Sequence, residues 1–113
     1  MMALLMGVKS ISPKDVFGLV ERAQVTVVDV NAPERYARAH VPGARSLDHE
    51  RFGADALPAD PNAPLVFYCS NPMCRKAPIA ARRAKAMGYK DVRVMSAGIT
   101  GWLSAGMPTE GSG

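Results

Sequence analysis

Cysteine is scarce in this sequence of 113 residues, and long apolar runs are absent. The two cysteines, Cys69 and Cys74, share one short stretch, whereas small secreted domains use more cysteines that are spread more widely. No apolar run reaches the roughly 20 residues that a membrane-spanning helix needs. The apolar start, residues 1–6, is short and lacks the basic residues that open a signal peptide. We therefore expect a cytoplasmic protein without a membrane partner.

Aromatic side chains are also few, and neither sign of charge dominates the chain strongly. Aromatics make up 6% of the residues and the net charge is +4. The basic residues are spread out, apart from short clusters at 75–76 and 82–85, and aromatics do not alternate with them. This pattern is typical of a solvated basic surface with a mild preference for small anions, and it argues against a nucleic-acid partner.

The cysteines and the two histidines do not have the spacing of a zinc site. We therefore expect no metal, and we predict no cofactor.

Strand and helix patterns alternate along the chain, which has the length of one domain. Ser12 and Pro13 are a helix N-cap and first helical residue, and Gly88 fits a helix C-terminus. We expect helices over 13–22, 32–38, 76–87 and 98–102, and strands over 25–30, 44–47, 65–68 and 92–95. This alternation predicts an α/β sandwich with a mostly parallel sheet. The domain should span residues 10–109, with flexible termini at 1–9 and 110–113.

The stretch around Cys69 carries the expected chemistry. Residues 65–68 form a continuous apolar run, as in a strand buried on both faces, and a helical pattern begins at Lys76. Cys69 should therefore lie at the carboxyl end of a central strand and face the first turn of a helix. The free N–H groups there can lower a thiol pKa from about 8.5 to roughly 3.5–7.5. Arg75 adds a positive charge, so we interpret Cys69 as a nucleophile and Arg75 as an anion-binding residue.

Three stretches of the chain resemble the rhodanese family of single-domain sulfurtransferases. The first combines Val27-Val28-Asp29-Val30-Asn31 and Glu34-Arg35-Tyr36 with Ala39-His40-Val41-Pro42-Gly43-Ala44. The second runs from Cys69 to Arg75, and the third combines Ala97-Gly98-Ile99-Thr100-Gly101-Trp102 with Gly106-Met107-Pro108. Each is weak alone, but their order and spacing make the resemblance strong over residues 10–109.

The resemblance implies a three-layer α/β/α sandwich with a five-stranded, mostly parallel sheet. It also implies that Cys69 carries a sulfane sulfur as a persulfide. A small anionic donor such as thiosulfate would supply the sulfur, and cyanide, a thiol or a sulfur-accepting protein would take it. The substrate loop would comprise Ser70, Asn71, Pro72, Met73, Cys74 and Arg75.

The loop departs from the usual pattern of the family. Cys69 to Arg75 spans seven residues, one more than in most such sulfurtransferases, and this length resembles rhodanese-fold phosphatases and arsenate reductases. Tyr68 stands where those enzymes usually have a histidine, and Pro72 removes one amide donor. We keep a phosphatase or arsenate reductase as an alternative function.

Cys74 leaves three roles open: a buried inert thiol, a resolving thiol that forms a disulfide with Cys69, or a second sulfur carrier. A non-enzymatic sulfur-relay or redox-sensing module that uses both cysteines is therefore a further alternative. Asp29 falls at the carboxyl end of the strand over 25–30, the edge where α/β sheets bind ligands. We interpret it as a support residue, held by hydrogen bonds or an ion pair, rather than as a base. His40 precedes a Val-Pro-Gly turn, where a turn-fixing hydrogen bond is favoured over proton transfer.

Overall fold

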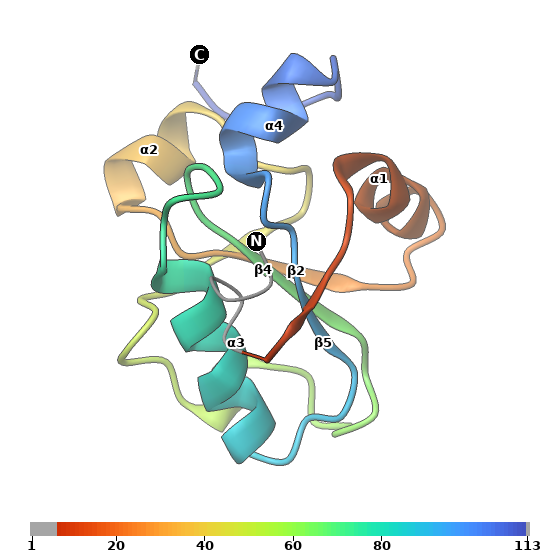
Figure 1. Ribbon diagram of the computed structural model, residues 1–113, viewed down its shortest axis with the longest axis vertical. Coiled ribbons are helices and arrows are strands. Elements are labelled where there is room, and N and C mark those ends of the chain that lie inside the picture. Colours follow the sequence, from red (N-terminus) through yellow and green to blue (C-terminus); the bar gives the residue numbers. More distant parts are fainter. Residues whose placement is uncertain (1–6, 113) are drawn as a thin grey trace.

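The computed structural model describes residues 7–112, which form a five-stranded parallel sheet between two layers of helices (Figure 1). The strands are β1 (Lys9–Ser10), β2 (Thr26–Asp29), β3 (Arg45–Ser46), β4 (Leu65–Tyr68) and β5 (Val92–Val94). The helices are α1 (Pro13–Glu21), α2 (Pro33–Arg38), α3 (Lys76–Ala86) and α4 (Gly98–Ser104), with a 3₁₀ turn, η2, at Ala54–Ala56. The predicted α/β fold and the five-stranded parallel sheet are therefore confirmed.

Strand β4 lies in the centre of the sheet, whose order is β1-β5-β4-β2-β3. All four of its residues are buried, as the continuous apolar run predicts. On one side β4 pairs with β2, which places Asp29 opposite Tyr68, and on the other side it pairs with β5. The next residue, Cys69, therefore leaves the middle of the sheet at its carboxyl edge.

Helices cover both faces of the sheet, and each face has its own apolar core. One face packs against α3, whose buried residues are mostly alanines, Ala77, Ala80, Ala81 and Ala84. The small side chains let α3 lie close to β4 and β5. The other face packs against α1 and α4, where Trp102 is fully buried. Cys69 belongs to the α3 core and Tyr68 to the opposite core, because successive residues of a strand point to opposite faces.

Both ends of the predicted domain pair with distant parts of the chain. Lys9 and Ser10 form β1, which pairs with β5, and Val8 is only 1% exposed. At the other end Glu110 exchanges two backbone hydrogen bonds with His40, both 2.9 Å long. Lys9 and Glu110, which lie in the segments expected to be flexible, therefore pair with backbone groups that are distant in sequence. Residues 1–6 and 113 lie outside the described part.

The predicted start of the first helix is confirmed in detail. The Ser12 hydroxyl accepts a hydrogen bond of 3.1 Å from the Asp15 N–H, and Pro13 opens α1. The cap satisfies one of the N–H groups that a helix start leaves free. Between residues 7 and 112, every helix is too short or too polar to cross a membrane.

Candidate functional site

The candidate site is the loop from Cys69 to Arg75, which connects the central strand β4 to α3. Cys69 is 2% exposed, Cys74 is half-buried, and Met73 at the tip of the loop is 75% exposed. Arg75 is the exposed N-cap residue of α3. Figure 1 shows that this loop lies close to α2 and α4, which come from other parts of the chain. The structure thus brings the predicted loop residues together at one edge of the sheet.

Helix α4 holds the first two residues of the loop through their carbonyl groups. The Ile99 N–H donates to the Cys69 carbonyl at 2.9 Å, and the Thr100 N–H donates to the Ser70 carbonyl at 3.0 Å. Because a trans peptide directs its C=O and N–H groups to opposite sides, the N–H groups of Ser70 and Asn71 point away from α4. These donors are therefore available on the side of the loop that faces away from α4.

Gly98 makes this close approach possible. Its φ is +67°, and a Cβ atom built on it would lie 2.5–2.6 Å from backbone atoms of Ser70 and Asn71. Only glycine combines the left-handed conformation with so little space. From the sequence we expected Gly98 only to open the helix over 98–102, as part of the third rhodanese-like stretch. Its glycine-rich surroundings are the signal that could have identified its contact with the loop.

Side chains from α2 and from the segment between β2 and α2 support the loop from the other side. The Ser70 hydroxyl donates to the Asn31 Oδ1 at 2.8 Å, and the Arg35 Nη1 lies 3.4 Å from the Ser70 Oγ. Asn31 is buried, whereas Arg35 is exposed. Neither residue was among the predicted site residues. Their positions after the end of β2, at the ligand-binding edge of the sheet, were the available signal.

Asn71 turns the loop back towards its starting point. Its side-chain Oδ1 accepts from the Met73 N–H at 2.9 Å, and its backbone carbonyl accepts from the Cys74 N–H at 3.1 Å. The two bonds fold residues 71–74 into a tight turn. Cys74 thereby returns to Cys69, and the two sulfur atoms form a disulfide with a Cα–Cα distance of 6.4 Å.

Asp29 lies on the opposite face of the sheet from Cys69. Its Oδ2 accepts from the Tyr68 hydroxyl at 2.6 Å, and its Oδ1 accepts from the Asn31 N–H at 2.8 Å. The Tyr68 oxygen in turn accepts from the Val41 N–H at 3.0 Å. Because Tyr68 faces the α1 and α4 core, the sheet separates this network from the Cys69 sulfur. The contacts fit a support residue and leave no path by which Asp29 could act as a base on Cys69.

Burial raises the pKa of Asp29 above the ordinary value for a carboxyl group, and the hydrogen bonds from Tyr68 and Asn31 oppose this effect. Burial also raises the pKa of Tyr68 far above its usual value, and the nearby Asp29 carboxylate adds to the rise. Tyr68 is therefore a neutral donor that fixes the carboxylate. His40 stays outside this network: its Nδ1 lies 2.6 Å from the Tyr36 carbonyl, and its ring stacks on Tyr36.

The start of α3 supplies the positive end of the site. Its first N–H groups have no partner within the helix, although Pro78, the third residue, has none to offer. Arg75 and Lys76 are both exposed at this end. Among residues 7–112, no carboxylate forms an ion pair with Arg75. The arrangement favours a small anion beside the loop.

A cavity of about 320 Å³ adjoins the loop between β2, β3 and the start of α3. It shares Asn31 with the hydrogen bond to Ser70, and Lys76 and His49 give it basic groups next to Asp48. Its polar side chains and position make it a candidate space for a donor or acceptor beside the loop.

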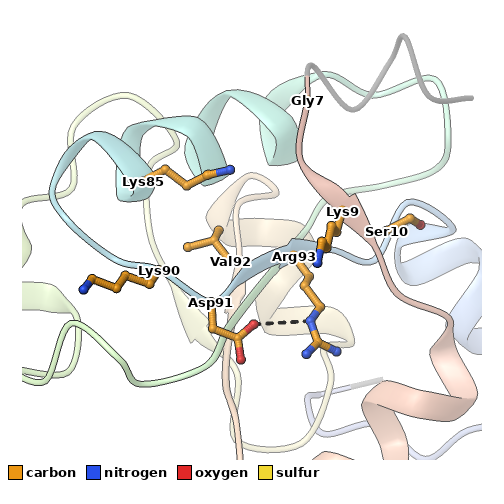
Figure 2. Close-up of a pocket in the computed structure, with 8 residues that line it drawn as sticks. All are labelled: Gly7, Lys9, Ser10, Lys85, Lys90, Asp91, Val92 and Arg93. Atoms are coloured by element: carbon orange, nitrogen blue, oxygen red, sulfur yellow. Dashed lines mark ion pairs between the residues drawn. The ribbon is translucent and has the colours of Figure 1, made fainter.

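A second cavity, of about 470 Å³, lies next to the edge strand β1 and its neighbour β5 (Figure 2). Figure 2 shows Lys9, Lys85 and Lys90 around it, and Arg93 paired with Asp91 at 3.3 Å. Its lining contains no cysteine. Lysines beside a short edge strand also protect the sheet from pairing with another chain. We therefore assign the chemistry to the Cys69 loop.

No group of three His, Cys, Asp or Glu side chains suited to a metal ion occurs in the described chain.

Comparison with known proteins gives one family for most of the chain. The model of the rhodanese-like domain matches residues 12–105. A thiosulfate sulfurtransferase GlpE from Pseudomonas fluorescens is 33% identical over 102 residues, which cover 90% of each protein.

Two solved structures extend the comparison. A thiosulfate sulfurtransferase from Pseudomonas aeruginosa has a TM-score of 0.81 and 26% identity, over 93% of this chain and 20% of the other. A Rhodopseudomonas palustris protein of unknown function, described as a possible tyrosine phosphatase, has a TM-score of 0.72 and 25% identity. It is matched over 96% of this chain and 92% of its own.

Proposed function

Since the chain belongs to the rhodanese-like domain family, we propose that it is a sulfurtransferase that works through a persulfide on Cys69. The donor is thiosulfate or a similar small anion, and the acceptor is cyanide, a thiol or a sulfur-accepting protein. The observation that carries the proposal is the position of Cys69. It directly follows the central strand and opens the loop to α3, whose first two carbonyls are held by α4.

The reaction has two half-reactions. The Cys69 thiolate attacks the outer sulfur of thiosulfate, the sulfur–sulfur bond of the donor breaks, and sulfite leaves with the bonding electron pair. The acceptor then attacks the outer sulfur of the persulfide and restores the thiolate. This is covalent nucleophilic catalysis, and it requires Cys69 in its reduced form. A reducing compartment such as the cytoplasm supplies that condition.

The loop has groups for each charged species in this reaction. The N–H groups at the start of α3 stabilise the thiolate, since the helix dipole is positive there. The N–H groups of Ser70 and Asn71 face away from α4 and can donate to a persulfide sulfur or a donor oxygen. Arg75 attracts the anionic donor and the leaving sulfite. Asn71, Pro72 and Met73 shape the loop, and Asp29 supports it through Asn31 and Tyr68.

The proposal is tested by measuring thiocyanate formed from thiosulfate and cyanide after the protein has been reduced. We expect turnover in the wild type and in Cys74→Ser, and none in Cys69→Ser. Circular dichroism of each variant would establish that the fold is retained. Equal activity in Cys69→Ser and Cys74→Ser, or inactivity of the reduced Cys74→Ser protein, would contradict the proposal.

A phosphatase or arsenate reductase is the enzymatic rival. The seven-residue loop and the structural similarity to a possible tyrosine phosphatase favour it. Against it, Pro72 removes an amide from the loop, and Asp29 is separated from Cys69 by the sheet. We expect the reduced protein to leave p-nitrophenyl phosphate and arsenate unchanged under conditions that give rapid thiocyanate formation.

A redox-sensing or sulfur-relay module is the non-enzymatic rival, and the Cys69–Cys74 disulfide favours it. Such a module would form this disulfide reversibly with an oxidant and show negligible turnover of small donors. Measured thiocyanate turnover therefore distinguishes a sulfurtransferase from a redox-sensing or sulfur-relay module.

A further inference from the structure

The loop that carries the proposed persulfide also carries a second thiol within bonding reach. Cys69 and Cys74 form a disulfide, and their Cα atoms lie 6.4 Å apart, within the usual range of about 4.4–6.8 Å. We propose that Cys74 resolves the Cys69 persulfide and releases its outer sulfur as hydrosulfide. The protein would then be a thiosulfate reductase that uses an external dithiol, in addition to a sulfurtransferase. The inference rests on the proposed persulfide.

The chemistry balances in three steps. First, the Cys69 thiolate takes the outer sulfur of thiosulfate and sulfite leaves. Second, the Cys74 thiolate attacks the Cys69 Sγ, the bond from Sγ to the outer sulfur breaks, and hydrosulfide leaves. The two cysteines are oxidised to a disulfide and the transferred sulfur is reduced. Third, a dithiol reduces the disulfide and becomes a disulfide itself. The sum converts thiosulfate and one dithiol into sulfite, hydrogen sulfide and one oxidised dithiol.

The turn at Asn71 prepares the loop for the second step. The Met73 and Cys74 N–H groups both donate to Asn71, so the turn that folds Cys74 back is held by hydrogen bonds of its own as well as by the disulfide. The other end of the loop is fixed, because Cys69 and Ser70 are tied to α4 and the Ser70 hydroxyl is tied to Asn31. With both ends held, closing the disulfide requires little additional ordering of the chain.

Burial favours the internal thiol over an external one. Cys69 is only 2% exposed in this arrangement of the loop, so a large acceptor has restricted access to its sulfur. Cys74 is already in place, and a well-oriented intramolecular group can act at an effective concentration far above that of any dissolved thiol. Compact nucleophiles such as cyanide remain able to compete. The ratio of hydrosulfide to thiocyanate therefore reports the competition between Cys74 and cyanide.

The experiment is a single turnover without oxygen or reductant. Reduced protein is mixed with excess thiosulfate, and sulfite, sulfide and intact mass are measured together. For the wild type we expect one equivalent of sulfite, one of sulfide and a mass lowered by two hydrogens. Cys74→Ser should release one equivalent of sulfite, retain one added sulfur and release no sulfide. Cys74→Ala serves as a second variant, because Cys74 packs against the α3 core, and Cys69→Ser should release neither product.

The outcomes separate this inference from the proposed function. Sulfite release with a stable added sulfur on the wild type, and no sulfide, would overturn the role of Cys74 and leave the sulfurtransferase intact. The absence of sulfite from every variant would overturn the proposed function itself. A disulfide that forms without equivalent sulfite and sulfide would also overturn the inference, since the oxidant would then be something other than the transferred sulfur.

Multiple turnover provides a second readout. With dithiothreitol as the dithiol, the wild type should release sulfide continuously, and Cys74→Ser should do so at least about tenfold more slowly. With cyanide and no dithiol, Cys74→Ser should direct nearly all of its sulfur to thiocyanate. Equal sulfide rates for the two proteins would contradict the inference.

Discussion

Gly98 leaves no room for a side chain, because the backbone of the loop lies directly against it. An alanine there would need a left-handed backbone, at about 1–2 kcal/mol, and would press against Ser70 and Asn71, at roughly 1–3 kcal/mol more. We therefore expect Gly98→Ala to lower the free energy of unfolding by roughly 2–5 kcal/mol and to reduce thiocyanate formation. Denaturant unfolding and the thiocyanate assay measure the two effects.

Gly106 provides a matched control for this substitution. It follows the same helix and has a similar φ of +75°, but nothing lies within 4 Å of its missing Cβ. Gly106→Ala should therefore cost only about 1–2 kcal/mol and leave the thiocyanate rate unchanged. Equal losses of stability in the two variants would show that the contact with the loop has no energetic weight.

Arg75 is the residue expected to recognise the donor anion. A charge-assisted hydrogen bond contributes about 1.5–3 kcal/mol, so Arg75→Ala should raise the KM for thiosulfate by roughly tenfold or more. The fold should persist, because the side chain is exposed. Arg38→Ala, which removes an exposed arginine near the end of α2, is the control and should leave this KM unchanged. A KM in Arg75→Ala equal to that of the control would exclude Arg75 from donor binding.

Asp29 should make stability depend on pH in an unusual direction. Its pKa is raised in the folded protein, so its contribution is greatest below the ordinary carboxyl pKa and is lost as the pH rises through the raised folded value. The difference in unfolding free energy between the wild type and Asp29→Asn should therefore shrink across that window. Urea unfolding at a series of acidic pH values measures it. A difference that grows with pH would show that the folded pKa is lowered instead.

At the scale of elements, α4 acts as the support on which the loop is held. Its first N–H groups bind the Cys69 and Ser70 carbonyls, and Trp102 anchors the helix in the core with a 2.7 Å hydrogen bond to the Pro108 carbonyl. Trp102→Phe removes this bond and leaves unfilled volume, so we expect a loss of about 1–3 kcal/mol in unfolding free energy. Thermal or denaturant unfolding measures the loss.

The neighbouring Leu103 is the control for this helix, because it is 51% exposed. Leu103→Ala should change stability by no more than roughly 0.5 kcal/mol. If both variants lost the same stability, the burial of Trp102 could not be what anchors α4.

The elements with strong local patterns were predictable from the sequence. Strand β4 has the predicted bounds, and α3 ends one residue before the predicted position. Strand β1 has no such pattern, since it consists only of Lys9 and Ser10 and exists through its pairing with β5. Local sequence cannot show a strand that depends on a distant partner.

At the scale of the whole molecule, the topology decides which site residues meet. The position of Cys69 after a buried strand was enough to predict its place at the carboxyl edge of the sheet, in the loop that leads to α3. The supporting contacts of Asn31, Arg35 and Gly98 were not predictable, because they connect residues that are distant in sequence. The two faces of the sheet likewise separate Asp29 from Cys69, which no spacing in the sequence reveals. For Cys74, the sequence left three roles open, and our proposal of the resolving role rests on the Asn71 turn and the disulfide with Cys69.

Locating the transferred sulfur tests the Cys69 persulfide more directly than any activity measurement. Reduced Cys74→Ser would be mixed with thiosulfate that carries a heavy sulfur isotope only at its outer position, then digested without reductant and fragmented in a mass spectrometer. We predict one heavy sulfur on Cys69 and its loss on treatment with cyanide. A protein without the heavy sulfur, or one that carries it on another residue, would contradict a Cys69 persulfide.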